Sequence, residues 1–327
     1  MEAVLQEIAE RKREADTIRT IYLGGGTPST LDAADIKRIL EAIDAPEAEE
    51  VTMELNPGDA TMEYLLALRA AGVNRLSIGI QSFDDRLLRT IGRRHNTAQA
   101  IEAVQMAQEA GFENLSIDLI YALPGQTMAQ WEADIETALG LQVQHISCYG
   151  LMYEEGTALT KRLEDGEIKA TDEETENAMY DRLCEQLKAA GFRHYEVSNF
   201  ALPGYEAKHN SSYWDGTPYI GIGAGAHSYL PPVRSWNPND MEAYIAGVMA
   251  RSLQRESETL TETDLYNERI MLGLRTSKGI VGPFPIQSRS IIERILRDGL
   301  LKKQDGRIVA TQQGLHILNR IIEDLMI

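Results

Sequence analysis

Short apolar runs recur along the first 200 residues, and each is followed by a polar loop and an amphipathic stretch. The runs are rich in residues that favour β-strands, and they lie at 20–23, 51–55, 75–80, 115–120, 145–151 and 194–198. The stretches between them have the pattern of helices with one apolar face. The sequence therefore predicts alternating strands and helices, which is typical of parallel β/α units.

The ends of the predicted helices carry their own signals. Gly72, Gly111 and Gly191 each follow a last helical turn, where a left-handed glycine stops a helix at little cost. Thr127 and Thr171 are followed three residues later by Gln or Glu, and we expect both to begin helices as capping boxes. Six such units, without a dinucleotide-binding fingerprint at the first turn, favour a barrel or partial barrel over a doubly wound sheet.

The pattern changes after Phe200. Residues 209–232, HNSSYWDGTPYIGIGAGAHSYLPP, are rich in Gly, Pro and aromatic residues, and we expect a long ordered loop there. Helices return at 261–275 and 288–301, and they are followed by a hairpin around 304–306 and a last helix at 314–326. These features divide the chain into a barrel at 1–205, a connecting region at 206–255 and a helical, winged-helix-like domain at 256–327.

Composition limits the partners. The 327 residues include 32 Lys and Arg against 50 Asp and Glu, a formal net charge of -18, so we expect no nucleic acid partner and interpret the winged-helix-like part as a packing or lid domain. No apolar run reaches the ~18 residues of a membrane-spanning helix, and the charged N-terminus does not resemble a signal peptide. We expect a cytoplasmic protein, either free or at the periphery of a membrane.

Polar residues follow or interrupt the strands of the first half. Three glycines and Thr27 come after the first run, and Glu54, Gln81 and Asp118 lie on the next three strands. A buried carboxylate needs a partner or a ligand, and Arg93 is the predicted charge partner. Glycines let the backbone approach a ligand closely, although a tight turn alone explains the run equally well. Together these residues predict a site for a small ligand with an amine and a carboxylate.

At this point the sequence resembles the radical S-adenosylmethionine (SAM) proteins related to oxygen-independent coproporphyrinogen III oxidase. The resemblance rests on YLGGGTPSTL, ELNP, RLSIGIQSF, GRRH and IDLIYALPGQT. HNSSYW, residues 219–229 and MLGLRTSKGI are similar to the heme chaperone HemW branch. The resemblance covers nearly the whole chain and implies an α/β fold: a partial (β/α)6 barrel and a small, mainly helical C-terminal domain.

The resemblance also implies a set of SAM-binding residues. Gly25, Gly26 and Thr27 match the glycine loop that contacts the methionine part of SAM, and Glu54 matches a carboxylate of the same pocket. In the oxidase relatives a second SAM site is lined by residues that match Gln81, Arg93 and Asp118.

One feature of the family is missing from the sequence. Its [4Fe-4S] cluster is held by C-x-x-x-C-x-x-C in a loop after the first barrel strand. The sequence has two cysteines, Cys148 and Cys184, and both are interpreted as small apolar residues of the interior. The strand that precedes the helix starting at Met1 is missing too. We therefore expect a misplaced start or a truncated chain, and no radical chemistry from the chain as written.

The motif HNSSYW implies a second site. In this branch it is associated with heme, and imidazole is a common axial ligand of heme iron, so His209 is the predicted ligand and His227 the next candidate. A structural histidine in a loop is the alternative. The predicted function is a heme chaperone that passes heme to a heme-accepting membrane protein. A coproporphyrinogen III oxidase and a fragment without function are the alternatives, and monomer and dimer both stay open.

Overall fold

The computed structural model describes residues 1–15 and 17–327, which fold as two units. The sheet unit comprises Tyr22–Leu31 and Val51–Ala207, and the terminal unit comprises Met1–Ile21, Asp32–Glu50 and Lys208–Ile327. Each unit is described by itself. The three-part division at residues 205 and 255 stays a prediction.

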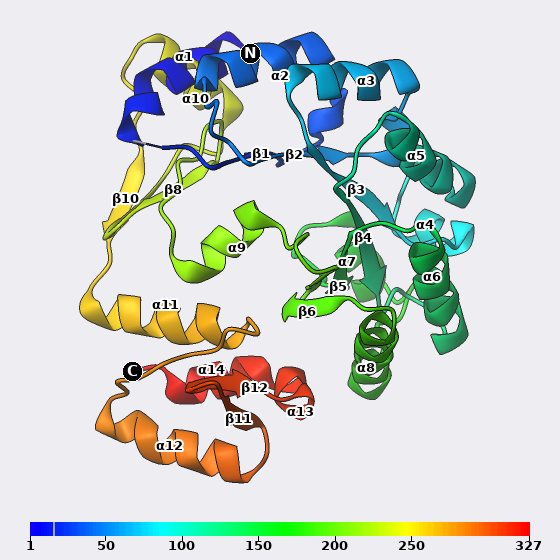
Figure 1. Ribbon diagram of the computed structural model, residues 1–327, viewed down its shortest axis with the longest axis vertical. Helices are drawn as coiled ribbons and strands as arrows, with labels where there is room; N and C mark the ends of the chain where they lie inside the picture. The colour runs from blue at the N-terminus through cyan, green and yellow to red at the C-terminus, as the bar shows by residue number, and fades with distance from the viewer. Residues whose placement is uncertain (16) are drawn as a thin grey trace. The chain divides into compact units, whose positions relative to one another are not determined.

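A curled seven-stranded sheet has the order β1-β2-β3-β4-β5-β7-β6 (Figure 1). Its strands are β1 (Thr20–Leu23), β2 (Glu50–Leu55), β3 (Arg75–Gln81), β4 (Leu115–Tyr121), β5 (His145–Gly150), β6 (Arg193–Glu196) and β7 (Asn199–Ala201). The pairs from β2 to β5 are parallel, as the alternating pattern predicted.

The far end of the sheet differs in one detail from the prediction. The run expected at 194–198 is β6, but it does not pair with β5 directly. The chain turns back at once into β7, which pairs antiparallel with both β5 and β6. The sequence did not reveal β7 because three residues are too few for a periodic pattern.

The helices of the sheet unit are α3 (Met62–Ala71), α4 (Asp85–Thr90), α5 (Thr97–Glu109), α6 (Met128–Gly140), α7 (Ala158–Glu164) and α8 (Glu173–Ala189). All of them except α7 lie along the outer side of the strands (Figure 1). The three predicted end glycines have positive φ angles. Thr127 forms the expected capping box, whereas the prediction for Thr171 was wrong: Asp172 caps α8 by accepting a hydrogen bond from the Thr175 N–H.

The strands separate an apolar face from a polar one. Leu76, Ile78 and Ile80 of β3 alternate along the strand and are fully buried. Ser77 and Gly79 alternate with them and lie on the opposite, inner face of the sheet, as does Gln81 at the end of the strand. Because this face is polar on several adjacent strands, it is the face that can hold a polar ligand.

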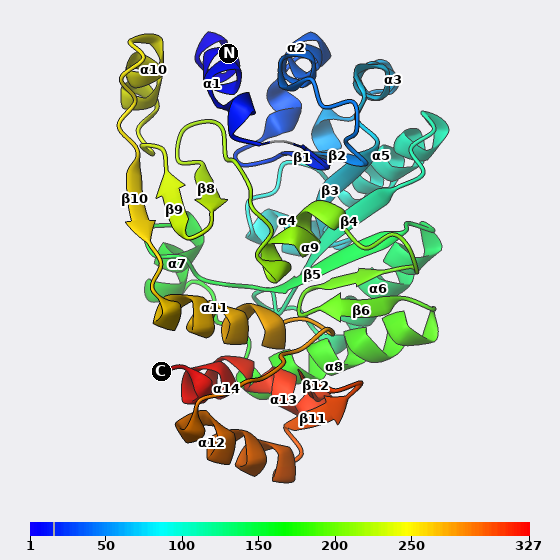
Figure 2. The ribbon, with the colours of Figure 1, turned by 60° about the vertical axis from the view of Figure 1, so that its left-hand side comes forward.

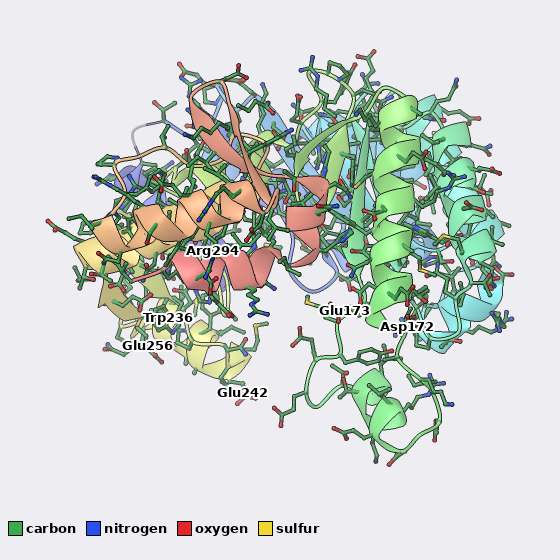
Figure 3. All side chains as sticks on the ribbon, turned by 90° about the horizontal axis from the view of Figure 1, so that it is seen from below. Asp172, Glu173, Trp236, Glu242, Glu256 and Arg294 are labelled. Atoms are coloured by element: carbon green, nitrogen blue, oxygen red, sulfur yellow. The ribbon has the colours of Figure 1, made fainter. Side chains whose placement is uncertain are left out.

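The terminal unit contains α1 (Glu2–Arg11), α2 (Ala33–Ile43) and a three-stranded antiparallel sheet (Figure 2). The strands are β8 (His227–Leu230), β9 (Val233–Trp236) and β10 (Glu256–Thr259), and α10 (Met241–Met249) lies between β9 and β10 in sequence. Trp236 and Glu256, labelled in Figure 3, are register partners on β9 and β10. The prediction of a long loop over 209–232 was wrong, because this segment contains most of helix α9 (Lys208–Asp215) and all of strand β8.

A buried carboxylate joins α1 to the rest of the terminal unit. Glu7 is fully buried and accepts hydrogen bonds from Asn237 Nδ2 at 2.9 Å, from Tyr244 Oη at 2.7 Å and from the Gly223 N–H at 2.9 Å. Arg255 pairs with the same carboxylate at 3.0 Å. Because these donors and Arg255 surround the Glu7 carboxylate, the cost of burying it is offset by hydrogen bonds and ion pairing.

The last part of the terminal unit confirms the predicted helices and hairpin. It consists of α11 (Glu262–Leu274), α12 (Ile286–Arg297), β11 (Leu301–Gln304), β12 (Arg307–Ala310), α13 (Gln312–His316) and α14 (Leu318–Leu325). The single last helix predicted at 314–326 is wrong, because α13 and α14 are separate helices. None of the helices among the described residues is long and apolar enough to cross a membrane.

Candidate functional site

The glycine run forms a turn that brings the backbone to a carboxylate. Gly25 has a φ angle of +104°, a conformation that a residue with a side chain rarely adopts. Its N–H donates to Glu54, which also accepts a 2.7 Å hydrogen bond from the Tyr22 hydroxyl. A Cβ at Gly24 would lie 3.0 Å from Glu54 Oε1. A side chain at Gly24 would also meet the Tyr22 ring, so Gly24 and Gly25 permit the close approach of this turn to Tyr22 and Glu54.

Asp118 is the second carboxylate on the polar face. It accepts a hydrogen bond from Ser77 Oγ at 3.1 Å and another from the side chain of Ser147. Burial raises the pKa of Asp118 to about 6, and the negative charge of Glu54 adds to this shift. Burial also raises the pKa of Glu54 above its usual value. Both carboxylates thus lie where a cationic ligand would restore favourable electrostatics.

Gln81 and Arg93 meet above Gly79. A Cβ at Gly79 would lie 3.0 Å from Arg93 Nη2 and 3.1 Å from Gln81 Nε2, so the missing side chain makes room for both groups. Arg93 Nη2 donates to the Gly79 carbonyl at 3.1 Å. Arg93 Nε is buried and has no hydrogen-bond partner among the described residues. Burial lowers the pKa of Arg93, and the nearby charge of Asp118 opposes that shift.

The structure brings together most of the predicted site residues within the sheet unit. Direct contacts or electrostatic interactions connect Gly25 with Glu54, Glu54 with Asp118, and Asp118 with Arg93, which shares the space over Gly79 with Gln81. Gly26 and Thr27 continue the same turn and are exposed. The Thr27 carbonyl accepts hydrogen bonds from the N–H and the hydroxyl of Thr30 within the same turn.

The donor set of this site suits SAM. Two carboxylates can face its ammonium and sulfonium groups, and a guanidinium with an unsatisfied buried N–H can face its carboxylate. Without a side chain, Gly79 lets the Arg93 guanidinium and the Gln81 amide lie together on the polar face, where both can face a ligand. Sequence reasoning missed Tyr22 and Ser77, although the alternation in RLSIGIQ places Ser77 on the same face as Gly79 and Gln81.

The same residues do not suit a [4Fe-4S] cluster. Cys148 lies buried on β5 and Cys184 lies on α8. In the described part of the chain, no three His, Cys, Asp or Glu side chains gather in a way that could hold a metal ion. Three-cysteine ligation of a cluster is therefore not provided by the residues described.

His209 is the second residue of helix α9 in the terminal unit. Its Nδ1 lies 2.8 Å from Thr20 Oγ1, and its Nε2 lies 2.9 Å from the Tyr213 hydroxyl one turn further along the helix. Glu50, which is 3% exposed, accepts hydrogen bonds from the N–H groups of Lys208 and His209. The carboxylate therefore fixes the start of α9, and both ring nitrogens of His209 have close polar neighbours.

Aromatic side chains continue from His209. The ring of Tyr213 meets His209 edge-on at 5.1 Å and Tyr219 edge-on at 4.8 Å between centroids. The ring centroids of Tyr219 and Tyr229 lie 6.2 Å apart, which extends the row to three tyrosines. His227, the other candidate ligand, is exposed and stacks on Trp236 at 5.7 Å. His209 thus stands at the end of a row of three tyrosine rings, whereas His227 contacts the ring of Trp236; aromatic surfaces of this kind suit a flat macrocycle.

Comparisons with known proteins agree with this arrangement. Residues 1–138 match the radical SAM superfamily model. The heme chaperone HemW of Lactococcus lactis is 37% identical over all of this chain and 89% of its own length. The heme chaperone HemW of Bacillus subtilis is 34% identical over 93% of this chain and 84% of its own length.

A solved structure supports the fold. The coproporphyrinogen III oxidase HemN of Escherichia coli, a radical SAM enzyme, matches with a TM-score of 0.81 over 99% of this chain and 82% of that chain. At 21% identity it shows a shared fold alone, and it confirms the predicted partial barrel with a helical C-terminal part. The relatives above, together with the superfamily match, show that the chain belongs to the HemW family of the radical SAM superfamily.

Proposed function

We propose that this chain is a heme chaperone that binds heme through His209 and passes it to a heme-accepting membrane protein. The observation that carries the proposal is the identity of 34–37% to proteins named heme chaperone HemW over most of their length. The geometry around His209 supports it. An imidazole in the first turn of a helix whose backbone N–H groups bond to Glu50, with the ring of Tyr213 beside it, has the chemistry of an axial heme ligand.

Ligand binding at His209 requires one local change. Iron coordination through Nε2 needs the nitrogen lone pair, and the Tyr213 hydroxyl lies 2.9 Å from that nitrogen. Tyr213 must therefore move away when heme binds. Thr20, at 2.8 Å from Nδ1, stays in place and orients the ring from the other side.

The site of the sheet unit is proposed to bind SAM. Glu54 and Asp118 would face the cationic groups of SAM, and Arg93 and Gln81 would bind the polar atoms of its methionine part. Gly25, Gly26 and Thr27 would form the turn around the methionine part. In radical SAM proteins, a reduced [4Fe-4S] cluster supplies the electron that cleaves SAM to a carbon-centred radical. The described residues do not provide the cysteine ligands of that cluster, so the role proposed for them is to bind and orient SAM.

A heme titration tests the main proposal. We expect wild type to develop a shifted Soret band on addition of hemin and His209→Ala to lose it, while the matched variant His227→Ala keeps it. An unchanged spectrum in His209→Ala would remove His209 as the ligand, and absence of hemin binding by wild type would overturn the chaperone proposal itself. The membrane acceptor, a cytoplasmic location and the choice between monomer and dimer stay predictions.

A further inference from the structure

Two neighbouring strands leave the sheet through an uncommon backbone conformation. Gln81, the last residue of β3, has a φ angle of +74°, and Ala122, directly after β4, has a φ angle of +60°. Residues with a Cβ seldom adopt this region, and they do so where the surrounding structure fixes them. Because Gln81 belongs to the proposed SAM site, whatever fixes these two turns also fixes the site.

One buried carboxylate bonds directly to the first of these turns and is connected to the second through a glutamine. Asp134 lies on α6, is 2% exposed, and accepts a 2.8 Å hydrogen bond from Ser82 Oγ and a 2.7 Å hydrogen bond from the Phe83 N–H. These two residues directly follow Gln81. Asp134 thus anchors the chain at the point where it leaves β3.

The second turn is connected through a glutamine. Gln126 Nε2 lies 3.4 Å from Asp134 Oδ2, and Gln126 Oε1 accepts a 3.2 Å hydrogen bond from the Leu123 N–H. Leu123 directly follows Ala122, whose carbonyl accepts a 3.1 Å hydrogen bond from the Thr171 hydroxyl. Both left-handed residues are therefore followed by a segment that is bonded to Asp134, directly or through Gln126.

We propose that Asp134 is a positioning residue of the SAM site. It holds the segment after Gln81, and thereby keeps the Gln81 amide beside Arg93 over Gly79. The inference rests on the proposed SAM site, because the effect on binding requires that SAM contacts Gln81. Asp134 is bonded to Ser82 and Phe83, the two residues after Gln81, so it acts on the site through the backbone.

The charge surroundings of Asp134 fit an anchoring role. Burial raises its pKa to about 6, the hydrogen bonds from Phe83 and Ser82 oppose that shift, and the nearby charge of Asp84 adds to it. The carboxylate is therefore mostly ionised at pH 7.5, where it is a strong acceptor for both turns. An ionised group kept in the interior at a cost is consistent with a role in shaping the site.

The experiment compares Asp134→Asn and Asp134→Ala with wild type by hydrogen–deuterium exchange and by calorimetric titration with SAM at pH 7.5. We expect faster amide exchange in residues 81–84 and 122–126 in both variants, with the centres of β3 and β4 unchanged. We expect SAM binding to weaken by about tenfold or more in Asp134→Ala and less in Asp134→Asn, which keeps one acceptor oxygen. Glu132→Ala on the same helix, which removes only the bond to Arg182, is the matched control and should change neither measurement.

The outcomes separate the inference from the proposed function. Unchanged exchange in both turns would overturn the anchoring role, whatever SAM does. Faster exchange with unchanged SAM affinity would overturn the positioning role. If wild type binds no SAM, the proposed SAM site falls and the positioning role falls with it, while the exchange data still decide whether Asp134 anchors the two turns. Asp134→Asn keeps the test valid if Asp134→Ala does not fold.

Discussion

The contact between Tyr213 and His209 leads to a prediction in an unusual direction: removing a hydroxyl should improve heme binding. The Tyr213 hydroxyl lies 2.9 Å from His209 Nε2, and the two rings meet edge-on at 5.1 Å. Tyr213→Phe removes the hydroxyl and keeps the ring. The variant therefore removes the polar competitor for the nitrogen without removing the aromatic surface beside it.

The size of the effect follows from the value of one hydrogen bond. A neutral hydrogen bond on a partly exposed surface contributes about 0.5–1.5 kcal/mol, and Tyr213 is 40% exposed. Wild type must break this bond before iron coordinates Nε2, whereas Tyr213→Phe has none to break. We expect hemin to bind about two- to tenfold more tightly to the variant, since 1.4 kcal/mol corresponds to a factor of ten.

The assay is a hemin titration followed by Soret absorbance, with dissociation rates measured by transfer to an apo-myoglobin acceptor. Tyr219→Phe is the matched control, because its ring packs on Tyr213 at 4.8 Å while its hydroxyl interacts with Arg234. That control should bind hemin like wild type. Weaker binding in Tyr213→Phe would refute the reasoning, because it would mean that the hydroxyl supports the bound state. Equal binding would show that iron does not use Nε2.

Three further changes test other parts of the structure. Gly79→Ala should weaken SAM binding about tenfold in calorimetry, because the new Cβ would lie 3.0 and 3.1 Å from the ends of the Arg93 and Gln81 side chains and displace them. Both side chains are flexible at these ends, so the melting temperature should change little. An unchanged affinity would contradict the proposed position of the SAM site. Asp118→Asn should make the fold more stable to urea at pH 7, by up to about 3 kcal/mol, and should weaken SAM binding. The sign follows because the folded pKa, about 6, lies above the usual 3.8: the ionised form costs stability at pH 7, and this cost fades as the pH falls from 6 towards 4. A variant that is less stable than wild type at pH 7 would reverse that conclusion. Glu7→Ala should lose about 3–5 kcal/mol of unfolding free energy, since it leaves Arg255 and three other donors without their acceptor. A loss below about 1 kcal/mol would show that the network contributes little.

Much of the sheet unit could be predicted because its signals are local. β3 alternates apolar and small or polar residues, so its buried face and its polar face both follow from RLSIGIQ alone. The three end glycines mark left-handed helix ends that depend on the nearest four residues. Parallel topology then brings strand ends to one edge, which is why Glu54, Gln81 and Asp118 could be expected together.

Helix α9 could not be predicted, because what fixes its start is distant in sequence. Its residues, KHNSSYWD, include Asn, two Ser and Asp, which favour caps and turns over helix interiors. The free N–H groups at its start are satisfied by Glu50, about 160 positions earlier in the chain. A local pattern cannot reveal a partner at that distance, and the segment was therefore interpreted as a loop.

Asp134 escaped sequence reasoning for a related reason. On α6 it follows the apolar periodicity of a buried helix face, where a single acidic residue gives no sign of what it contacts. Its partners are the N–H and hydroxyl groups just beyond β3 and a glutamine beyond β4. Only the folded chain brings these groups together.

Several destabilising features of the sheet unit lie in the predicted site or in the turns beside it. Gln81 and Ala122 have left-handed backbones without being glycine, Asp118 and Asp134 carry charges whose pKa values burial has raised to about 6, and Arg93 keeps a buried N–H without a described partner. Each of these features lowers the stability of the fold by itself. The alternating apolar residues of β3 and β4, which are fully buried, supply the stability that offsets them. Because a cationic ligand would improve the surroundings of Asp118, and a carboxylate would satisfy Arg93, these costs at the strand ends are explained more simply by ligand binding than by the requirements of the fold.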